Sequence, residues 1–176
     1  MGALDIVVES LPADGRRLRG DVELTVVAEG GAEDIDVQGP VAYDLWLTAL
    51  GSTVTVKGSL GAVVGVSCSR CAGSFEIPVD RAFEAVFVTA DTGEADGAVE
   101  LDENDLDLDY YGGGVIDGVR LLAEQILLEL PMKVLCAKDC KGLCATCGAN
   151  LNETDCDCEA QVDPRWESLK DLRDRL

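Results

Sequence analysis

The sequence predicts an α+β fold in which a β-rich meander or barrel-like domain is followed by one long helix and a cysteine-rich tail. Three observations support this prediction. Short runs of β-branched and apolar residues fill residues 1–90, an apolar stripe with helical spacing covers 115–131, and six of the eight cysteines lie in 132–176. Residues 91–114, between the strands and the helix, are predicted to form an acidic loop. Because 47% of the 176 residues are hydrophobic, the chain can bury a sizeable core.

The first 90 residues contain most of the predicted strands. Val41–Leu50 alternates partly between apolar and polar side chains, as does a strand with one buried face. Gly51 and Ser52 then reverse the chain, which predicts a hairpin. A meander of this kind has free edges, which favours closure into a barrel or a strongly curled sheet. The other predicted strands are Leu4–Val8, Val22–Ala28, Thr53–Lys57, Leu60–Val66, Phe75–Ile77 and Arg81–Val88.

The loop predicted at 91–114 is strongly acidic. It contains no lysine or arginine and ends in three successive glycines, Gly112–Gly114. A series of carboxylates can bind calcium, but the loop glycine and final glutamate of an EF-hand are missing at the required spacing. We therefore interpret the segment as an exposed loop. Its carboxylates belong to Asp91, Glu94, Asp96, Glu100, Asp102, Glu103, Asp105, Asp107 and Asp109.

The long helix is predicted from apolar residues spaced three and four apart. Pro131 ends it, because proline lacks the amide donor and disfavours helical backbone at Leu130. A short final helix is expected to begin at Asp163, with Pro164 in its first position. The apolar stripe of the long helix consists of Ile116, Val119, Leu122, Ala123, Ile126, Leu127 and Leu130.

Composition restricts the possible functions. The formal net charge of −20 repels nucleic-acid backbones and favours a basic partner, although acidity also serves solubility. The chain has no histidine, which excludes Ser-His-Asp and Cys-His catalysis. It has no apolar stretch long enough to span a membrane, and its first residues lack the pattern of a signal peptide. These features predict a cytoplasmic protein that is not an enzyme.

The cysteines carry the most specific information. A reducing cytosol disfavours disulfides, so clustered cysteines there indicate metal or redox chemistry. Cys68 and Cys71 form a C-x2-C motif, and Cys144 and Cys147 form a second one. A glycine follows each motif within two residues and suits a tight metal-binding turn. The other four cysteines are Cys136, Cys140, Cys156 and Cys158.

Eight thiols suit two zinc ions with four cysteine ligands each, although one zinc per chain is also possible. The preferred pairing has one site formed by Cys144, Cys147, Cys156 and Cys158. Its other site ties the tail to the β-rich domain through Cys68, Cys71, Cys136 and Cys140. In the alternative, one zinc uses four of the last six cysteines and the first motif stays vacant. Disulfides, an iron–sulfur cluster and simple burial of the thiols are the remaining explanations.

Four thiolates fill the tetrahedral shell of zinc and leave no position for a substrate, so sites of this kind are structural. Oxidation can nevertheless release metal from such thiolates. A redox-regulated zinc–thiolate protein, acting as a chaperone or a sensor, is therefore the main alternative function. A metal-dependent enzyme that uses the acidic loop is a weaker one.

The tail also resembles a known family. The segment CAKDCKGLCATCGANLN at 136–152, followed by Cys156–Cys158 and Asp163–Arg165, closely resembles the C-terminal signature of the YceD family, the large ribosomal RNA subunit accumulation proteins. Cys68–Cys71 and Leu128–Pro131 stand where that family has the corresponding motifs. Ala145 replaces a proline that is frequent in the family.

The resemblance implies a non-enzymatic bacterial or organellar factor that large-subunit ribosomal RNA needs in order to accumulate. With a charge of −20, we expect the chain to contact a basic ribosomal protein or assembly factor and to reach the RNA indirectly. The basic side chains available for local RNA contact are Arg16, Arg17, Arg19, Lys138 and Lys141.

Overall fold

The computed structural model describes residues 3–25, 36–89, 108–158 and 165. The chain forms two compact units, each of them discontinuous in sequence. Unit 1 consists of residues 1–66 and 76–132, and unit 2 consists of residues 67–75 and 133–176. All eight cysteines therefore belong to unit 2. Most of the acidic loop, and the short helix predicted at Asp163 apart from Arg165, lie outside the described residues.

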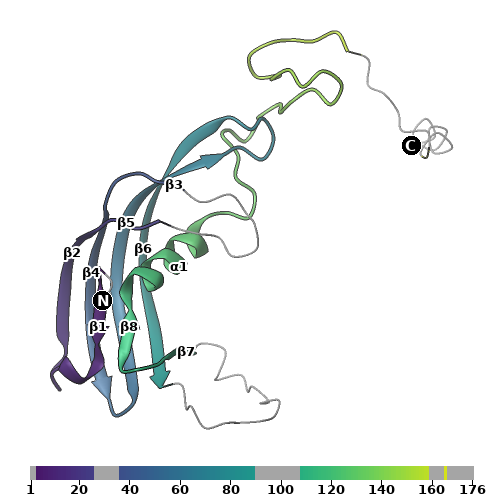
Figure 1. The fold of residues 1–176 in the computed structure, drawn as a ribbon. Helices are drawn as coiled ribbons and strands as arrows, with labels where there is room; N and C mark the ends of the chain where they lie inside the picture. Colours follow the sequence, from purple (N-terminus) through teal and green to yellow (C-terminus); the bar gives the residue numbers. More distant parts are fainter. Residues whose placement is uncertain (1–2, 26–35, 90–107, 159–164, 166–176) are drawn as a thin grey trace. The chain divides into compact units, whose positions relative to one another are not determined.

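The main sheet is open and its strands follow the order β2-β4-β5-β6-β7, with β3 also paired to β5 (Figure 1). The pairs β2–β4, β3–β5 and β4–β5 are antiparallel, whereas β7 runs parallel to β6. The predicted meander is thus present, but the barrel-like closure is wrong, because β2 and β7 end the strand order without pairing to each other. The strands are β2 Arg16–Val22, β3 Asp36–Val37, β4 Val41–Leu50, β5 Thr53–Ser67, β6 Ser74–Thr89 and β7 Leu108–Tyr111.

The β4–β5 hairpin forms as its turn residues predict. Leu50 pairs with Thr53 across a turn in which Gly51 has a φ of 62°. The two strands predicted at 53–57 and 60–66 are one continuous strand, β5, which passes through Gly58. A Cβ at Gly58 would lie 2.5 Å from the Asp44 carbonyl oxygen, so a residue without a side chain lets the two strands approach there.

The helix α1 spans Gly118–Glu129, within the predicted 115–131. It begins later than the apolar stripe because Val115–Asp117 forms a strand, β8, that pairs with β1 (Asp5–Val7). Asp117 is the N-cap, and its side chain accepts a hydrogen bond from the Arg120 amide at 3.0 Å. The predicted acidic loop likewise ends early, since Leu108–Tyr111 forms β7. A three-residue 3-10 helix, Val8–Ser10, follows β1.

The core of unit 1 lies between α1 and one face of the main sheet (Figure 1). Leu45 and Leu47 of β4 contribute alternate side chains to it, and Leu122 and Ile126 of α1 close it from the helix side. All four side chains are fully buried, which removes their apolar surface from water. No helix among the described residues is long and apolar enough to cross a membrane.

Arg81 holds α1 against β6. Its guanidinium donates to the Gln125 Oε1 at 3.1 Å and to the Glu129 Oε2 at 2.8 Å. Gln125 is only 9% exposed. We expect Arg81→Met to lower the free energy of unfolding by about 1–3 kcal/mol, because the buried amide loses its partner.

Chemical denaturation measures this change. The matched control is Lys57→Met, which removes an ion pair to Glu84 whose side chains are 61% and 52% exposed. It should change the stability by less than about 0.5 kcal/mol. Equal effects of the two substitutions would contradict a special role for Arg81.

Candidate metal centres

The eight cysteines of unit 2 form two groups of four. Within each group all four sulfur atoms lie within 4.8 Å of one another. The grouping is that of the preferred pairing, and binding of metal by these thiols stays a prediction. Centre 1 contains Cys68, Cys71, Cys136 and Cys140, and centre 2 contains Cys144, Cys147, Cys156 and Cys158.

The sulfur separations in centre 1 match a tetrahedral thiolate site. The Sγ atoms of Cys68 and Cys140 are 3.8 Å apart, and those of Cys71 and Cys136 are 3.7 Å apart. A tetrahedral ion with metal–sulfur bonds of about 2.3 Å places its ligands about 3.8 Å from each other. A disulfide would need about 2.05 Å, and all eight cysteines are free. The donor set and its spacing therefore fit a four-coordinate metal ion.

The two C-x2-C motifs have the same backbone hydrogen bonds. In the first, the amide of Cys68 donates to the Gly73 carbonyl and the amide of Ala72 donates to the Cys68 carbonyl, both at 2.9 Å. In the second, Cys144 donates to Ala149 at 2.8 Å and Gly148 donates to Cys144 at 2.9 Å. This tight turn brings both sulfurs of a motif to the same side.

The same turn also directs an amide at the first sulfur of each motif. Arg70 donates to the Cys68 Sγ at 3.5 Å, and Thr146 donates to the Cys144 Sγ at 3.4 Å. Amide donors of this kind stabilise a thiolate. The backbone of each C-x2-C motif thus stabilises a thiolate even without a bound ion.

Each turn needs a left-handed residue directly after its second cysteine. Gly148 fills this position in the second motif with a φ of 74°, but Ala72 fills it in the first with a φ of 55°. From the sequence alone, Gly73 would be the residue expected to adopt this conformation in the first motif, but it lies one residue beyond the left-handed position. A side chain at a left-handed position strains the backbone.

This difference gives a pair of opposite predictions. Ala72→Gly should tighten metal binding at centre 1, and Gly148→Ala should weaken it at centre 2, each by a factor of about five, because the strain amounts to about 1 kcal/mol. Competition with a chelator of known affinity measures both changes. Gly61→Ala is the control, since its φ is ordinary and no atom lies within 4 Å of the added Cβ. Shifts of the same sign would contradict the assignment.

Centre 1 is largely buried. Cys68, Cys71 and Cys140 are 3%, 8% and 4% exposed, and Phe75 and Leu135 pack against them. Ser69 donates its amide to the Val134 carbonyl at 2.8 Å, which joins residues 67–75 to the tail. The contact therefore links the two sequence segments that make up unit 2.

Arg70 strengthens this link within unit 2. Its Nη1 donates to the Cys140 carbonyl at 2.8 Å, and its own carbonyl accepts from the Leu143 amide at 3.1 Å. The first C-x2-C turn is thereby fixed to the residues that lead from centre 1 to centre 2. Centre 2 is more open: Cys147 and Cys158 are exposed, and Cys144 and Cys156 are partly buried.

The thiol pKa values show why each centre favours a cation. The backbone amides of Cys136, Cys71 and Arg70 lower the pKa of Cys68 to about 6. Hydrogen bonds with the Cys140 and Cys68 sulfurs raise the pKa of Cys136 to about 12. Crowded thiols cannot all ionise without a compensating positive charge.

Centre 2 shows the same contrast. The Cys147 and Thr146 amides lower the pKa of Cys144 to about 6, whereas the Cys147 sulfur raises the pKa of Cys158 to about 12. A divalent cation would remove the conflict in either group, because it binds the thiolate form of every ligand.

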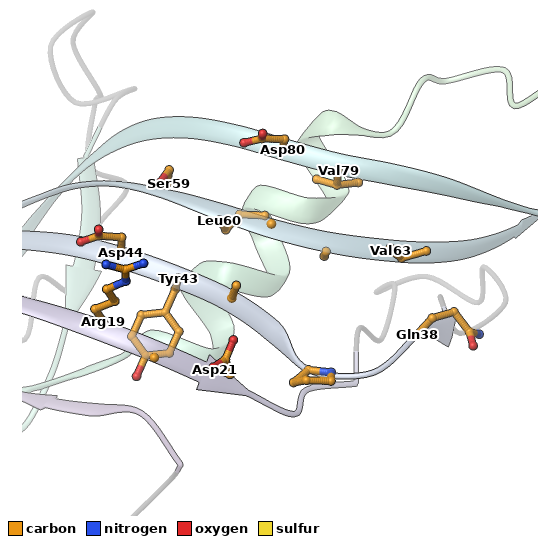
Figure 2. A pocket seen from close by; sticks show the side chains of 15 residues that line it. Arg19, Asp21, Gln38, Tyr43, Asp44, Ser59, Leu60, Val63, Val79 and Asp80 are labelled. Carbon is orange, nitrogen blue, oxygen red and sulfur yellow. The ribbon is translucent and has the colours of Figure 1, made fainter.

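Unit 1 has an open groove of about 630 Å³ beside β2, β4, β5 and β6 (Figure 2). Its charged lining is mixed and consists of Arg19, Asp21, Asp44 and Asp80. Among the described residues, no further group of cysteine and carboxylate side chains is arranged to hold a metal ion. The described residues that line the groove therefore form no third candidate metal centre.

Comparison with known proteins identifies the family. The family described as "Large ribosomal RNA subunit accumulation protein YceD" matches residues 56–173, a span that includes both centres. The chain belongs to the YceD family. The resemblance drawn from the tail motifs is thereby confirmed.

YceD relatives occur in bacteria and plants. An uncharacterized protein of Mycobacterium leprae is 29% identical over 175 residues, covering 97% of this chain and 70% of its own length. One from Mycobacterium tuberculosis is 28% identical over 151 residues, with coverages of 86% and 67%. A maize protein named "Large ribosomal RNA subunit accumulation protein YCED homolog 1, chloroplastic" is 30% identical over 144 residues, covering 68% of this chain and 49% of its own length. No solved structure gives a significant match.

One residue of the YceD signature gains a role that the motif alone did not reveal. Asn152 donates from its Nδ2 to the Cys140 Sγ at 3.3 Å, and its Oδ1 accepts from the Lys141 amide at 2.8 Å. Its Nδ2 also donates to the Oδ1 of Asn150, the residue that forms an isolated β-bridge with Leu143. Asn152 lies between Cys147 and Cys156 in sequence, so it links the loop of centre 2 to a sulfur of centre 1. In the sequence, this role of Asn152 was indicated by its position within the YceD signature.

Proposed function

We propose that this YceD chain is a non-enzymatic factor on which the accumulation of large-subunit ribosomal RNA depends, and that each cysteine centre holds a structural zinc ion. The match over residues 56–173 carries the first part. Plant relatives of the chain bear names that refer to accumulation of this RNA. A cytoplasmic location belongs to the same proposal.

Zinc is favoured for both centres by donor type and number. Each group consists of four cysteine sulfurs, and no carboxylate of the described residues joins either group. Thiolates select soft or borderline ions such as zinc. Bound zinc would join the segments of unit 2 without offering an open coordination position. The residues that would hold it are the four cysteines of each centre, with Asn152 and the Arg70 and Thr146 amides supporting the sulfurs.

The partner is proposed to be a basic ribosomal protein or assembly factor. The net charge of −20 opposes binding to bare RNA. A closed four-thiolate zinc site adds about −2 to this charge, so metal binding does not reverse it. The RNA would then depend on this protein through the basic partner.

Depletion of the protein in its own organism tests the function. We expect large-subunit ribosomal RNA to fall relative to small-subunit RNA and to recover with the wild-type gene but not with Cys140→Ser. Ser69→Ala, inside the same C-x2-C motif, should restore it. An unchanged RNA ratio after depletion would refute the function.

Two titrations at physiological salt test the partner. Basic proteins recovered with the chain should bind at submicromolar concentration and weaken with added salt. Bare large-subunit RNA fragments should bind weakly. Submicromolar binding to RNA that does not improve when the carboxylates at 91–107 are neutralised would overturn the indirect mode. It would assign the contact to the arginines of β2 and to Lys138 and Lys141.

The exposed thiols of centre 2 favour a second candidate, a redox-regulated zinc protein. Cys147 and Cys158 are accessible to an oxidant, whereas three ligands of centre 1 are not. Mild peroxide separates the two functions. Loss of metal with an immediate change in the RNA ratio supports redox regulation, and loss of metal without such a change refutes it.

A further inference from the structure

One edge of the main sheet has no partner strand among the described residues. β2 ends the strand order and pairs with β4 alone. In Figure 1 it is the outermost strand on the left of the sheet. No other described segment forms a backbone hydrogen bond with Arg16–Val22. The outer side of β2 therefore presents backbone donors and acceptors that can pair with another strand.

Side chains of opposite charge stand at equal distances on the two sides of Gly20. Arg17 and Arg19 precede Gly20, and Asp21 and Glu23 follow it at the matching distances, Glu23 lying one residue beyond the end of β2. All four of these charged residues are exposed. Leu18 and Val22 stand at equal distances from Gly20 on the other face of the strand. A sequence of this kind is complementary to itself when it is read in the opposite direction.

We propose that two copies of this chain pair through antiparallel β2 strands, with Gly20 of each copy at the two-fold axis. Arg19 then lies opposite Asp21 of the second copy, and Arg17 lies opposite Glu23 of the second copy. Leu18 lies opposite Val22 of the second copy on the other face. Two-fold symmetry produces each pair twice. The main sheet becomes continuous across the dimer.

Other registers are less favourable. A shift of one residue places side chains from opposite faces against each other, which a continuous sheet does not allow. Moving the axis to Arg19 places the two Arg19 side chains opposite each other, and like charges directly opposite destabilise a strand pair. Gly20 at the axis has no side chain, so the two strands can approach there without a clash.

The neighbouring strand supports the arrangement. Arg17 forms a bidentate pair with Asp44 of β4, through bonds of 2.7 and 2.6 Å. Arg19 stands opposite Asp44 in the strand register, and Figure 2 shows its guanidinium directed toward that carboxylate. The dimer places Arg19 between Asp44 of its own copy and Asp21 of the second. An acidic peptide or an RNA backbone fits less well, since either would also meet Asp21 and Glu23.

Only one short strand from each copy meets at this interface. Small interfaces are usually weak, so we expect a dissociation constant in the range of about 1–100 µM. Because the charged pairs lie at the surface, the dimer should weaken as salt rises. The proposal requires no metal, and it stands independently of the function proposed above.

Sedimentation equilibrium and light scattering of the full chain test the proposal with two reciprocal variants. Arg19→Asp and Asp21→Arg each create two repulsive pairs in the dimer, so each should raise the dissociation constant at least about tenfold. An equal mixture should restore the dimer, because aspartate at 19 of one copy meets arginine at 21 of the other. Lys57→Glu, in the middle of the sheet, should leave the dimer intact. Circular dichroism verifies that all variants are folded.

Three results would overturn the proposal. The first is a wild-type chain that stays monomeric at low salt and a concentration of about 200 µM, well above the expected dissociation constant. The second is a dimer that neither single variant weakens. The third is a mixture of folded variants that fails to associate. Binding of an acidic peptide or RNA to the monomer through the β2 arginines would instead assign this edge to that partner.

Discussion

Replacing Cys140 with serine is expected to remove the zinc ion of centre 1 and to unfold the part of unit 2 that this centre holds together. Cys140 is a buried member of centre 1, and a serine hydroxyl is a poor zinc ligand. Structural zinc contributes about 10–16 kcal/mol of apparent binding free energy, which far exceeds the stability of a short irregular segment. The ion of centre 1 and the fold of the segments around it should therefore be lost together.

Elemental analysis and hydrogen exchange measure the two consequences. The amides of Ser69 and Leu143 should lose protection, because their bonds to Val134 and Arg70 hold the segments of unit 2 together. Amides within β4 and β5 of unit 1 should stay protected. Ser69→Ala should leave both zinc content and exchange unchanged. Full protection of Leu143 in the Cys140→Ser protein would contradict a structural role for the metal.

The zinc-loaded protein is expected to lose its two ions at different rates, centre 2 before centre 1. A chelator or an oxidant must reach sulfur, and in centre 1 three of the four sulfurs belong to buried residues. Centre 2 has two exposed cysteines. We expect two phases of equal amplitude that differ in rate by about tenfold or more, on the reasoning that accessible thiolates react first.

A zinc-sensitive dye follows the release in excess chelator or mild peroxide. Cys147→Ser should abolish the fast phase and retain the slow one, which assigns the fast phase to centre 2. Thr146→Ala, in the same turn, should retain both phases, because its contribution to the Cys144 sulfur comes from the backbone amide. A single phase containing both ions would contradict the difference in access.

Prediction from sequence succeeded where a local pattern decides the structure. The hairpin at Gly51 and the end of the helix near Pro131 follow from turn and proline chemistry. The two groups of four cysteines correspond to the preferred pairing, which the sequence favoured but did not settle. The motifs alone could not exclude a single zinc, because that choice depends on whether residues 68–71 reach the tail.

The sequence of β2 has the alternation of a strand, but its arginines conceal this pattern. Leu18, Gly20 and Val22 alternate with Arg17, Arg19 and Asp21, as in a strand with one buried face. The three nearby arginines also fit a basic patch, and the strand expected at Val22–Ala28 begins where β2 ends. Residues 23–25 form no strand, and 26–28 lie outside the described residues.

β7 and β8 depend on contacts that no local pattern records. Leu108–Tyr111 pairs with β6 in parallel register, and Val115–Asp117 pairs with β1, more than a hundred residues earlier. Such short strands carry little propensity of their own, so only their tertiary partners define them. The same holds for the barrel expectation, because closure depends on strands at opposite ends of the sheet.

Centre 1 has a consequence for the chain as a polymer. Cys71 and Cys136 are 65 residues apart, and β6, β7, β8 and α1 all lie between them. A metal ion held by both would act as a reversible cross-link, which restricts the unfolded chain as a disulfide does, by roughly 4 kcal/mol for a loop of this length. During synthesis Cys68 and Cys71 leave the ribosome long before their partners, whereas the ligands of centre 2 emerge within a single stretch from Cys144 to Cys158. Because its ligands are close in sequence, centre 2 can fold locally. Centre 1 can form only after the tail has been synthesised.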